Sequence, residues 1–344
     1  MRRRILIILT IMAVSCIACL GSFYLWVRSE LETPYFNASA SVIYVDIARG
    51  RNTTQIAHLL VDSGVLHSRI PFILYLRYKE MGHRIQAGEY RFFRPASPKE
   101  IAKRLVRGDV YYRPITVPEG LTARETIELL ARNGFGNLAE LQNSLLRTDW
   151  IHDLDPASQN LEGYLFPETY RFGRKVDSET VVRTMVRMFR RKLEEVLSDC
   201  PLPEGWNVPR IVTLASMIEK EVKVVEEGPL VASVLVNRLR KKIPLSCDAT
   251  IIYAMKLAGT YEGNLSRTDL KMDSPYNTYL YPGLPPGPIA NPGLASLRAA
   301  LRPAETSYLY YVSRNDGTHQ FSEDLRSHNQ AVDRFQRSPR RNTQ

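Results

Sequence analysis

Cysteine is scarce in this sequence, whose 344 residues contain only 4 Cys, with 6 His and 3 Trp. Cys16 and Cys19 lie in an apolar N-terminal run, so Cys200 and Cys247 remain for either one disulfide or two free thiols. The low number excludes a fold held together by many disulfides, and the stability of the chain must come from a hydrophobic core.

Sequence motifs of several enzyme classes are also missing. The chain has no glycine-rich phosphate-binding loop and no nucleophile elbow. His319 and His328 are too far apart, and too poorly supplied with cysteine or carboxylate neighbours, to suggest a zinc site. We therefore expect neither a metal nor another cofactor.

Acidic residues are outnumbered, because 46 Lys and Arg against 36 Asp and Glu give a formal charge of +10. The basic residues are interspersed with acids and form no stripe with aromatic residues, which argues against a nucleic-acid partner. An anionic membrane surface or an acidic polymer fits this charge better. Much of the excess lies between Arg326 and Arg341, and we predict a disordered tail over residues 336–344.

An uncharged apolar run occupies residues 5–27, behind arginines at positions 2–4. A helix of about 20 such residues crosses a bilayer, and the run is longer than the core of a signal peptide. Lipidation at Cys16 is disfavoured, because the apolar run continues well beyond it. We predict an uncleaved single-pass anchor with a cytoplasmic N-terminus at residues 1–4, so the chain beyond Arg28 lies outside the cytoplasm.

Beyond a linker at residues 28–41, a weak repeat with an offset of 70 residues reads strand, turn, helix in each copy. Thr53 and Thr122 are the expected helix caps, and Gly64 and Gly134 the expected stops. Between the copies, residues 88–92 alternate like a strand, and a capping box at residues 97–100 opens a helix over 101–106. We expect small βαβ-like modules.

The module at residues 42–112 resembles a LysM-like carbohydrate-binding module, and a generic α+β module is the alternative. Residues 113–335 form the second predicted domain, so the fold class is α+β. Its expected helices are an amphipathic core helix at 178–197, one opened by Pro209, and two more at 229–240 and 250–256. The proline-rich residues 281–288 must form an extended, stiff loop.

Glu219 interrupts the otherwise apolar helical run 211–222. Helical periodicity places its carboxyl beside the hydrocarbon of Val212, Ala215 and Val222, surroundings that disfavour the charged form of an acid. A glutamate that stays protonated near neutral pH can act as a general acid in breaking glycosidic bonds. The alternative is a solvated glutamate at the rim of an apolar face.

Several sequence blocks, in order along the chain, resemble the YceG-like family of endolytic transglycosylases. The blocks are residues 161–170, 214–221, 236–239, 274–279, 283–288 with 291–293, and 317–322. In that family the first glutamate of the 214–221 block is the catalytic one, which is Glu219 here. The family also has a single N-terminal anchor.

The resemblance implies cleavage of the β-1,4 bond between N-acetylmuramic acid and N-acetylglucosamine in nascent peptidoglycan, which terminates glycan strands. One glutamate serves as acid and then as base, and leaves a 1,6-anhydro end, so no second carboxylate is required. The implied enzyme is a lyase of the inner membrane with a periplasmic catalytic domain, and peptidoglycan synthases are the expected partners.

Other acids near these blocks are weaker candidates. Glu221 lies on a different helix face from Glu219 and is interpreted as solvated. Glu162 either lines the groove or makes cap or loop hydrogen bonds. Asp248 either contacts substrate or caps the next helix, and its block departs from the family pattern where Cys247 and Ala249 stand.

Amide and aromatic side chains suited to gripping sugars complete the predicted groove. These are Asn237, Tyr276, Asn277 and Tyr279. A peptidoglycan-binding scaffold without activity and a muramidase that hydrolyses the same bond are the two rival functions.

Overall fold

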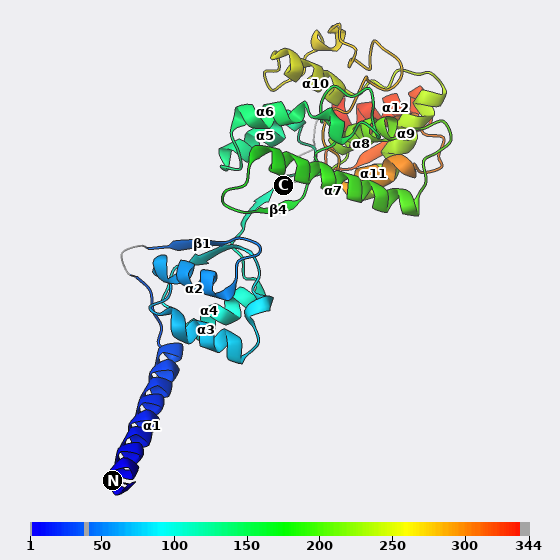
Figure 1. Cartoon of the computed structure of the whole chain (residues 1–344). Helices are drawn as coiled ribbons and strands as arrows, with labels where there is room; N and C mark the ends of the chain where they lie inside the picture. Colours follow the sequence, from blue (N-terminus) through cyan, green and yellow to red (C-terminus); the bar gives the residue numbers. More distant parts are fainter. Residues whose placement is uncertain (1, 38–40, 338–344) are drawn as a thin grey trace, which may run out of the picture. The chain divides into compact units, whose positions relative to one another are not determined.

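The computed structural model describes residues 2–37 and 41–337, which divide into two compact units. The first unit runs to Arg113 and includes Gly173–Lys175, and the second contains Pro114–Phe172 and the chain from Val176 on. Both units combine helices with strands (Figure 1), so the predicted α+β class is confirmed.

The apolar N-terminal run forms a single helix, α1 (Arg2–Glu32). Its section Arg3–Glu32 has the length and composition of a membrane span, and an 18-residue window within it has a mean hydropathy of 2.5. The helix continues through the first residues of the predicted linker, because Arg28 to Glu32 remain helical. Near its end Glu30 contacts His67 and Glu32 contacts Lys99, at 2.9 and 2.8 Å, which ties α1 to the rest of the first unit.

The remainder of the first unit is a two-stranded sheet with helices. Strand β1 (Ile43–Ile47) pairs antiparallel with β2 (Gly88–Phe92), with Ile43 opposite Phe92. The antiparallel pairing corrects the expected βαβ-like arrangement, in which the strands would be parallel. The other elements are α2 (Thr53–Asp62), α3 (Arg69–Tyr78), η1 (Gly82–Arg84) and α4 (Pro98–Arg107).

Both copies of the repeat contain a capped helix followed by a glycine stop. Helices α2 and α5 (Ala123–Arg132) begin 70 residues apart, and both open with a capping box. Thr122 caps α5 as predicted, whereas Asn52, and not Thr53, caps α2. Gly64 and Gly134 have φ of +76° and +71°, the left-handed conformation expected of helix stops.

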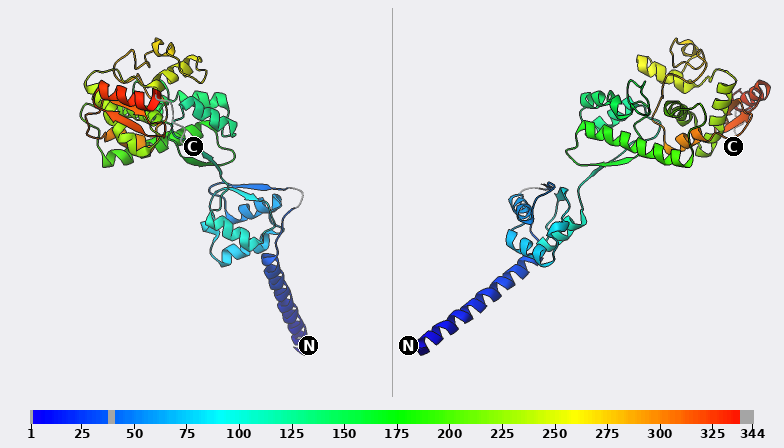
Figure 2. Two further views of the ribbon diagram at one scale, coloured as in Figure 1. Left: turned by 180° about the vertical axis from the view of Figure 1, so that it is seen from behind. Right: turned by 45° about the vertical axis from the view of Figure 1, so that its right-hand side comes forward.

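The second unit is mainly helical (Figures 1 and 2). Its strands form two small sheets, β3 (Arg113–Thr116) with β4 (Thr169–Phe172) and β5 (Tyr310–Ser313) with β6 (His319–Ser322). Its helices are α5, α6 (Leu138–Leu145), α7 (Ser178–Asp199), α8 (Val208–Glu221), α9 (Gly228–Arg240), α10 (Asp248–Ala258), α11 (Leu294–Leu301) and α12 (Leu325–Val332). Short turns are η2 (Thr148–Trp150), η3 (Val225–Glu227), η4 (Asp269–Lys271) and the π-helical η5 (Asp333–Arg337).

Helix α8 lies in the interior of the second unit (Figure 1). Asn207 caps it, Pro209 stands in its first turn, and all residues from Ile211 to Ile218 are buried. Helices α9 and α11 pack against it. The amphipathic helix predicted over 178–197 is confirmed as α7, whose buried face includes Met185 and Phe189.

Residues 281–293 contain no helix or strand, in agreement with the predicted proline-rich loop. Cys200 and Cys247 are both free thiols. Of the predicted tail, residues 338–344 lie outside the described part of the chain, whereas Gln336 and Arg337 belong to η5.

Candidate active site

Glu219 stands in the last turn of α8, directly after the eight consecutive buried residues that end at Ile218. The residue itself is half-buried, so its carboxyl group lies at the edge of the hydrophobic core. The backbone N–H of Gly293 donates a hydrogen bond to Glu219 Oε2 at 2.9 Å. Because Glu219 is only half-buried, a substrate can contact it, and the hydrogen bond from Gly293 fixes the orientation of its carboxyl group.

The loop at 281–293 is fastened to α8 next to this acid. Ile289 donates its backbone N–H to Ser216 Oγ at 3.0 Å, and Pro288 packs beside Gly163. Asn291 accepts a hydrogen bond from the Leu165 N–H at its Oδ1, 3.0 Å away. The proline-rich loop and the 161–170 block therefore converge on the helix that carries Glu219.

A second carboxyl group lies at the same place, and the sequence interpretation did not identify it. Glu119 follows β3 in a Pro-Glu-Gly turn, and a Cβ added to Gly293 would overlap its carboxyl group. Partial burial and, second, the negative charge of Glu219 raise the pKa of Glu119. Glu119 and Glu219 therefore flank one glycine, although they lie 100 residues apart in the sequence.

Glu221 is not solvated as the sequence interpretation held. It is half-buried, and its two oxygens accept hydrogen bonds from the Cys247 thiol and the Tyr311 hydroxyl, each at 3.0 Å. Burial and the charge of Glu221 raise the pKa of both donors. Helix periodicity separated Glu221 correctly from Glu219 but did not predict the residues that cover it.

Glu162 is buried, and its hydrogen bonds are of the cap or loop type that was one of its two predicted roles. Its Oε1 accepts the Ala123 N–H at 2.9 Å, at the first turn of α5, and its Oε2 accepts the Tyr253 hydroxyl at 3.2 Å. Burial raises the pKa of Glu162 to about 8. Tyr276 packs on Tyr253, with ring centroids 4.9 Å apart.

Asp248 is the first residue of α10, and its side chain makes no capping hydrogen bond, which corrects that alternative. Its exposed carboxylate instead accepts the Tyr279 hydroxyl at 2.6 Å. Asn277 is completely buried and donates to the Leu270 and Met272 carbonyls at 3.0 and 2.8 Å. Asn277 therefore holds the loop before residue 281 and has no surface for contact with a sugar.

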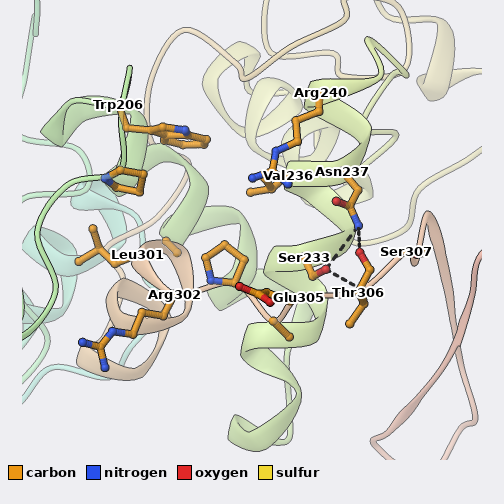
Figure 3. Close-up of a pocket in the computed structure, with 14 residues that line it drawn as sticks. Trp206, Ser233, Val236, Asn237, Arg240, Leu301, Arg302, Glu305, Thr306 and Ser307 are labelled. Carbon is orange, nitrogen blue, oxygen red and sulfur yellow. Dashed lines mark hydrogen bonds between the residues drawn. The ribbon is translucent and has the colours of Figure 1, made fainter.

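Asn237 lies away from these groups, on α9, beside a cavity of about 840 Å³ (Figure 3). Its Nδ2 donates to the Thr306 and Tyr308 carbonyls at 2.8 and 3.0 Å, which joins α9 to the segment before β5. Trp206 and Arg240 line the same cavity, and Glu219 is not among its lining residues. This cavity is thus separate from the candidate acid.

His319 has a carboxylate partner that the sequence interpretation did not foresee. Its Nδ1 lies 2.6 Å from Glu227 Oε2, and its backbone N–H donates to Glu227 Oε1 at 3.0 Å. Over residues 2–37 and 41–337, no three His, Cys, Asp or Glu side chains gather as a metal site.

The family assignment follows from comparison with known sequences, because the YceG-like family model matches residues 45–334. The chain belongs to the YceG-like family. Across 332 residues it is 32% identical to a Bacillus subtilis (strain 168) protein named endolytic murein transglycosylase, which covers 92% of this chain and 91% of the relative.

A protein of the same name from Streptococcus pneumoniae serotype 2 (strain D39 / NCTC 7466) is 29% identical over 309 residues, but the match spans 55% of that longer relative. A crystal structure of a yceG-like protein from Listeria monocytogenes superposes with a TM-score of 0.55 at 29% identity, over 84% of this chain and 98% of that one. The YceG-like fold therefore accounts for almost the whole chain beyond α1.

Proposed function

We propose that this YceG-like protein is an endolytic peptidoglycan lytic transglycosylase with Glu219 as its general acid and base. The observation that carries the proposal is the position of Glu219 at the end of a buried helix, held by the Gly293 N–H at 2.9 Å. The names of the Bacillus and Streptococcus relatives agree with this activity.

The geometry suits a proton transfer in two steps. Because Glu219 Oε2 accepts the Gly293 N–H, the second carboxyl oxygen, Oε1, remains to carry the proton. That proton passes to the leaving O4 of N-acetylglucosamine as the C1–O4 bond breaks. The carboxylate then takes the proton of the muramoyl C6 hydroxyl, whose oxygen bonds to C1 and closes the 1,6-anhydro ring.

Substrate contacts are proposed for the side chains that remain accessible near the loop. Tyr276 and Tyr279 are half-buried and Asp248 is exposed, so they can contact a glycan strand. Asn237 is proposed only as a part of the wall of the separate 840 Å³ cavity.

Residues 42–112 of the first unit are proposed to form a LysM-like peptidoglycan-binding module. The order β1, α2, α3, β2 and the antiparallel pairing of the two strands support a compact module of this type. Helix α1 is proposed to cross the inner membrane with its arginines in the cytoplasm, so that residues 42–112 and the second unit lie in the periplasm. Peptidoglycan synthases are the proposed partners, since the substrate is a nascent strand.

One product analysis separates the proposed activity from its rivals. The full chain in detergent is incubated with peptidoglycan, and the fragments are identified by mass spectrometry. Anhydro ends that disappear with Glu219→Gln are the expected result. Reducing ends would show a muramidase, no cleavage would show a scaffold, and an active Glu219→Gln enzyme would refute the proposed mechanism.

A further inference from the structure

Two carboxyl groups lie beside Gly293, and a mechanism with a single acid assigns a role to only one of them. Breaking the glycosidic bond gives C1 an oxocarbenium-like positive charge, and a fixed negative charge beside it lowers the barrier. Glu219 is neutral at that moment, because it is giving up its proton only as the bond breaks. A group that keeps its negative charge beside C1 throughout the reaction would stabilise this positive charge further.

Glu119 is placed for this task by contacts of the residue that follows it. Gly120, at φ +75°, donates its N–H to the Asn291 carbonyl at 3.0 Å and accepts the Lys220 ammonium at 3.0 Å. Position 120 also lies against Glu219, whose Cγ would be 3.6 Å from a Cβ added there. The turn that carries Glu119 is thus fastened both to α8 and to the proline-rich loop.

The Glu119 side chain itself is not used to hold the fold together. No group in the described part of the chain donates a hydrogen bond to its carboxylate or forms an ion pair with it. The residue as a whole is exposed, although its carboxyl group lies against Gly293 and is partly buried there. Gly293 is the N-cap of α11, so both carboxyl groups lie at the positive end of a helix, which offsets part of their mutual repulsion.

We propose that Glu119 is a second catalytic residue, which stays ionised beside the protonated Glu219 and stabilises the positive charge that develops at the muramoyl C1. This inference rests on the proposed lytic transglycosylase function. Glu119 neither gives nor takes a proton in it, so the atom balance of the reaction is unchanged. Of the two causes that raise the pKa of Glu119, partial burial is the larger, and the second, the charge of Glu219, is absent whenever Glu219 carries its proton.

The distance between the carboxyl groups of Glu119 and Glu219 also allows hydrolysis with Glu119 as the base. The test must distinguish this reaction from lytic transglycosylation. Both lie against one residue, so standard backbone bond lengths keep their nearest oxygens within about 8 Å. Inverting hydrolases separate their carboxyl groups by about 6.5 to 9.5 Å and use the second one to activate water. Glu119 as a water-activating base would give reducing ends, whereas Glu119 as a charge stabiliser gives anhydro ends.

The experiment measures kcat, KM and product ends for the full-length enzyme in detergent, with Glu119→Gln, Glu119→Asp and the control Glu262→Gln. We expect Glu119→Gln to lower kcat about 100-fold with KM changed less than about threefold, because only the charge is removed. The alkaline limb of its pH–rate profile should move to lower pH, since the pair has lost one of two interacting charges. Glu119→Asp should recover part of kcat, and Glu262→Gln, at an exposed position, should match wild type.

Two results would overturn the inference while leaving the proposed function intact. One is a Glu119→Gln enzyme that forms anhydro ends at more than half the wild-type kcat with an unchanged pH profile. The other is a loss of kcat accompanied by an equal fall in the folded fraction, which would make Glu119 structural. If wild type gave reducing ends that depend on Glu119, both the charge-stabilising role and the lytic transglycosylase function would be wrong.

A second variant tests the geometry independently. Gly293 has φ −80°, so alanine is tolerated by the backbone, and the overlap of its Cβ with Glu119 is the expected source of damage. Gly293→Ala should therefore lower kcat strongly in wild type but much less in the Glu119→Gln background. An equal fall in kcat in both backgrounds would show that Gly293→Ala does not act through Glu119, and would contradict the proposed contact between the two residues.

Discussion

Ile289 donates its backbone N–H to Ser216 Oγ at 3.0 Å, one turn before Glu219 on α8, and both residues are buried. The same hydroxyl donates to the Thr213 carbonyl at 2.7 Å, so its donor and acceptor roles are both used. This contact attaches the loop that carries Gly293 to the helix that carries the acid. A serine in the middle of an apolar helix thus positions the site without contact with the substrate.

Ser216→Ala should lower the free energy of unfolding by about 1 to 3 kcal/mol, because the buried Ile289 N–H loses its acceptor. We also expect a lower kcat, since the loop that orients Glu219 is loosened. Chemical denaturation and product assays check both effects, with Ser198→Ala on the exposed surface of α7 as the control. Unchanged stability and activity would show that the loop is held by other contacts.

Gly163→Ala should be the most destabilising of these substitutions. Gly163 has φ +85°, and a Cβ there would lie 2.5 Å from two atoms of Pro288. Strain and overlap together should lower the free energy of unfolding by about 3 kcal/mol or more. Gly205→Ala, with φ +75° and nothing within 4 Å, isolates the backbone cost, expected near 1 kcal/mol. Similar losses for the two variants would rule out the contact with Pro288 as the cause.

The buried carboxyl of Glu162 should make stability depend on pH. Its pKa is raised from 4.5 to about 8, so the folded state holds the proton more tightly than the unfolded state. Stability from this group is complete below pH 4.5 and is lost as the pH rises through about 8. At about 1.4 kcal/mol per pKa unit, the loss amounts to a few kcal/mol.

Glu162→Gln should remove this dependence, because the amide oxygen still accepts the Ala123 N–H and carries no charge at any pH. The difference in Tm between the variant and wild type should grow in favour of the variant from pH 5 to pH 9. Thermal unfolding at several pH values measures it, with the exposed Glu204→Gln as the matched control. A constant difference across that range would mean that Glu162 ionises normally in the folded protein.

Asn237→Ala should affect stability more than substrate affinity. Its amide donates to two backbone carbonyls before β5, and the loss of both hydrogen bonds should cost about 1 to 3 kcal/mol. Denaturant titration together with KM measurement distinguishes the two roles, and Asn264→Ala at an exposed position is the control. A higher KM with unchanged stability would instead assign Asn237 to the substrate.

Local features of the fold were predictable because they depend on neighbours in the sequence. The caps at Ser97 and Thr122 and the buried face of α7 follow from residues three or four positions apart. Helix α3 was missed, and the cap of α2 was assigned one residue too late, at Thr53 and not at Asn52. In the latter case two adjacent polar residues compete for the same role, and sequence alone does not rank them.

The sequence by itself determined the apolar helix that carries Glu219, the N-terminal apolar segment and the family. Only the tertiary structure decided which groups surround that acid, because Glu119, Ser216 and Gly293 meet through long-range packing. The tertiary structure also buries Glu162 and Asn277, which the sequence had suggested as groove residues. Periodicity reports the face on which a side chain lies, whereas the partner on that face is chosen by the whole folded chain.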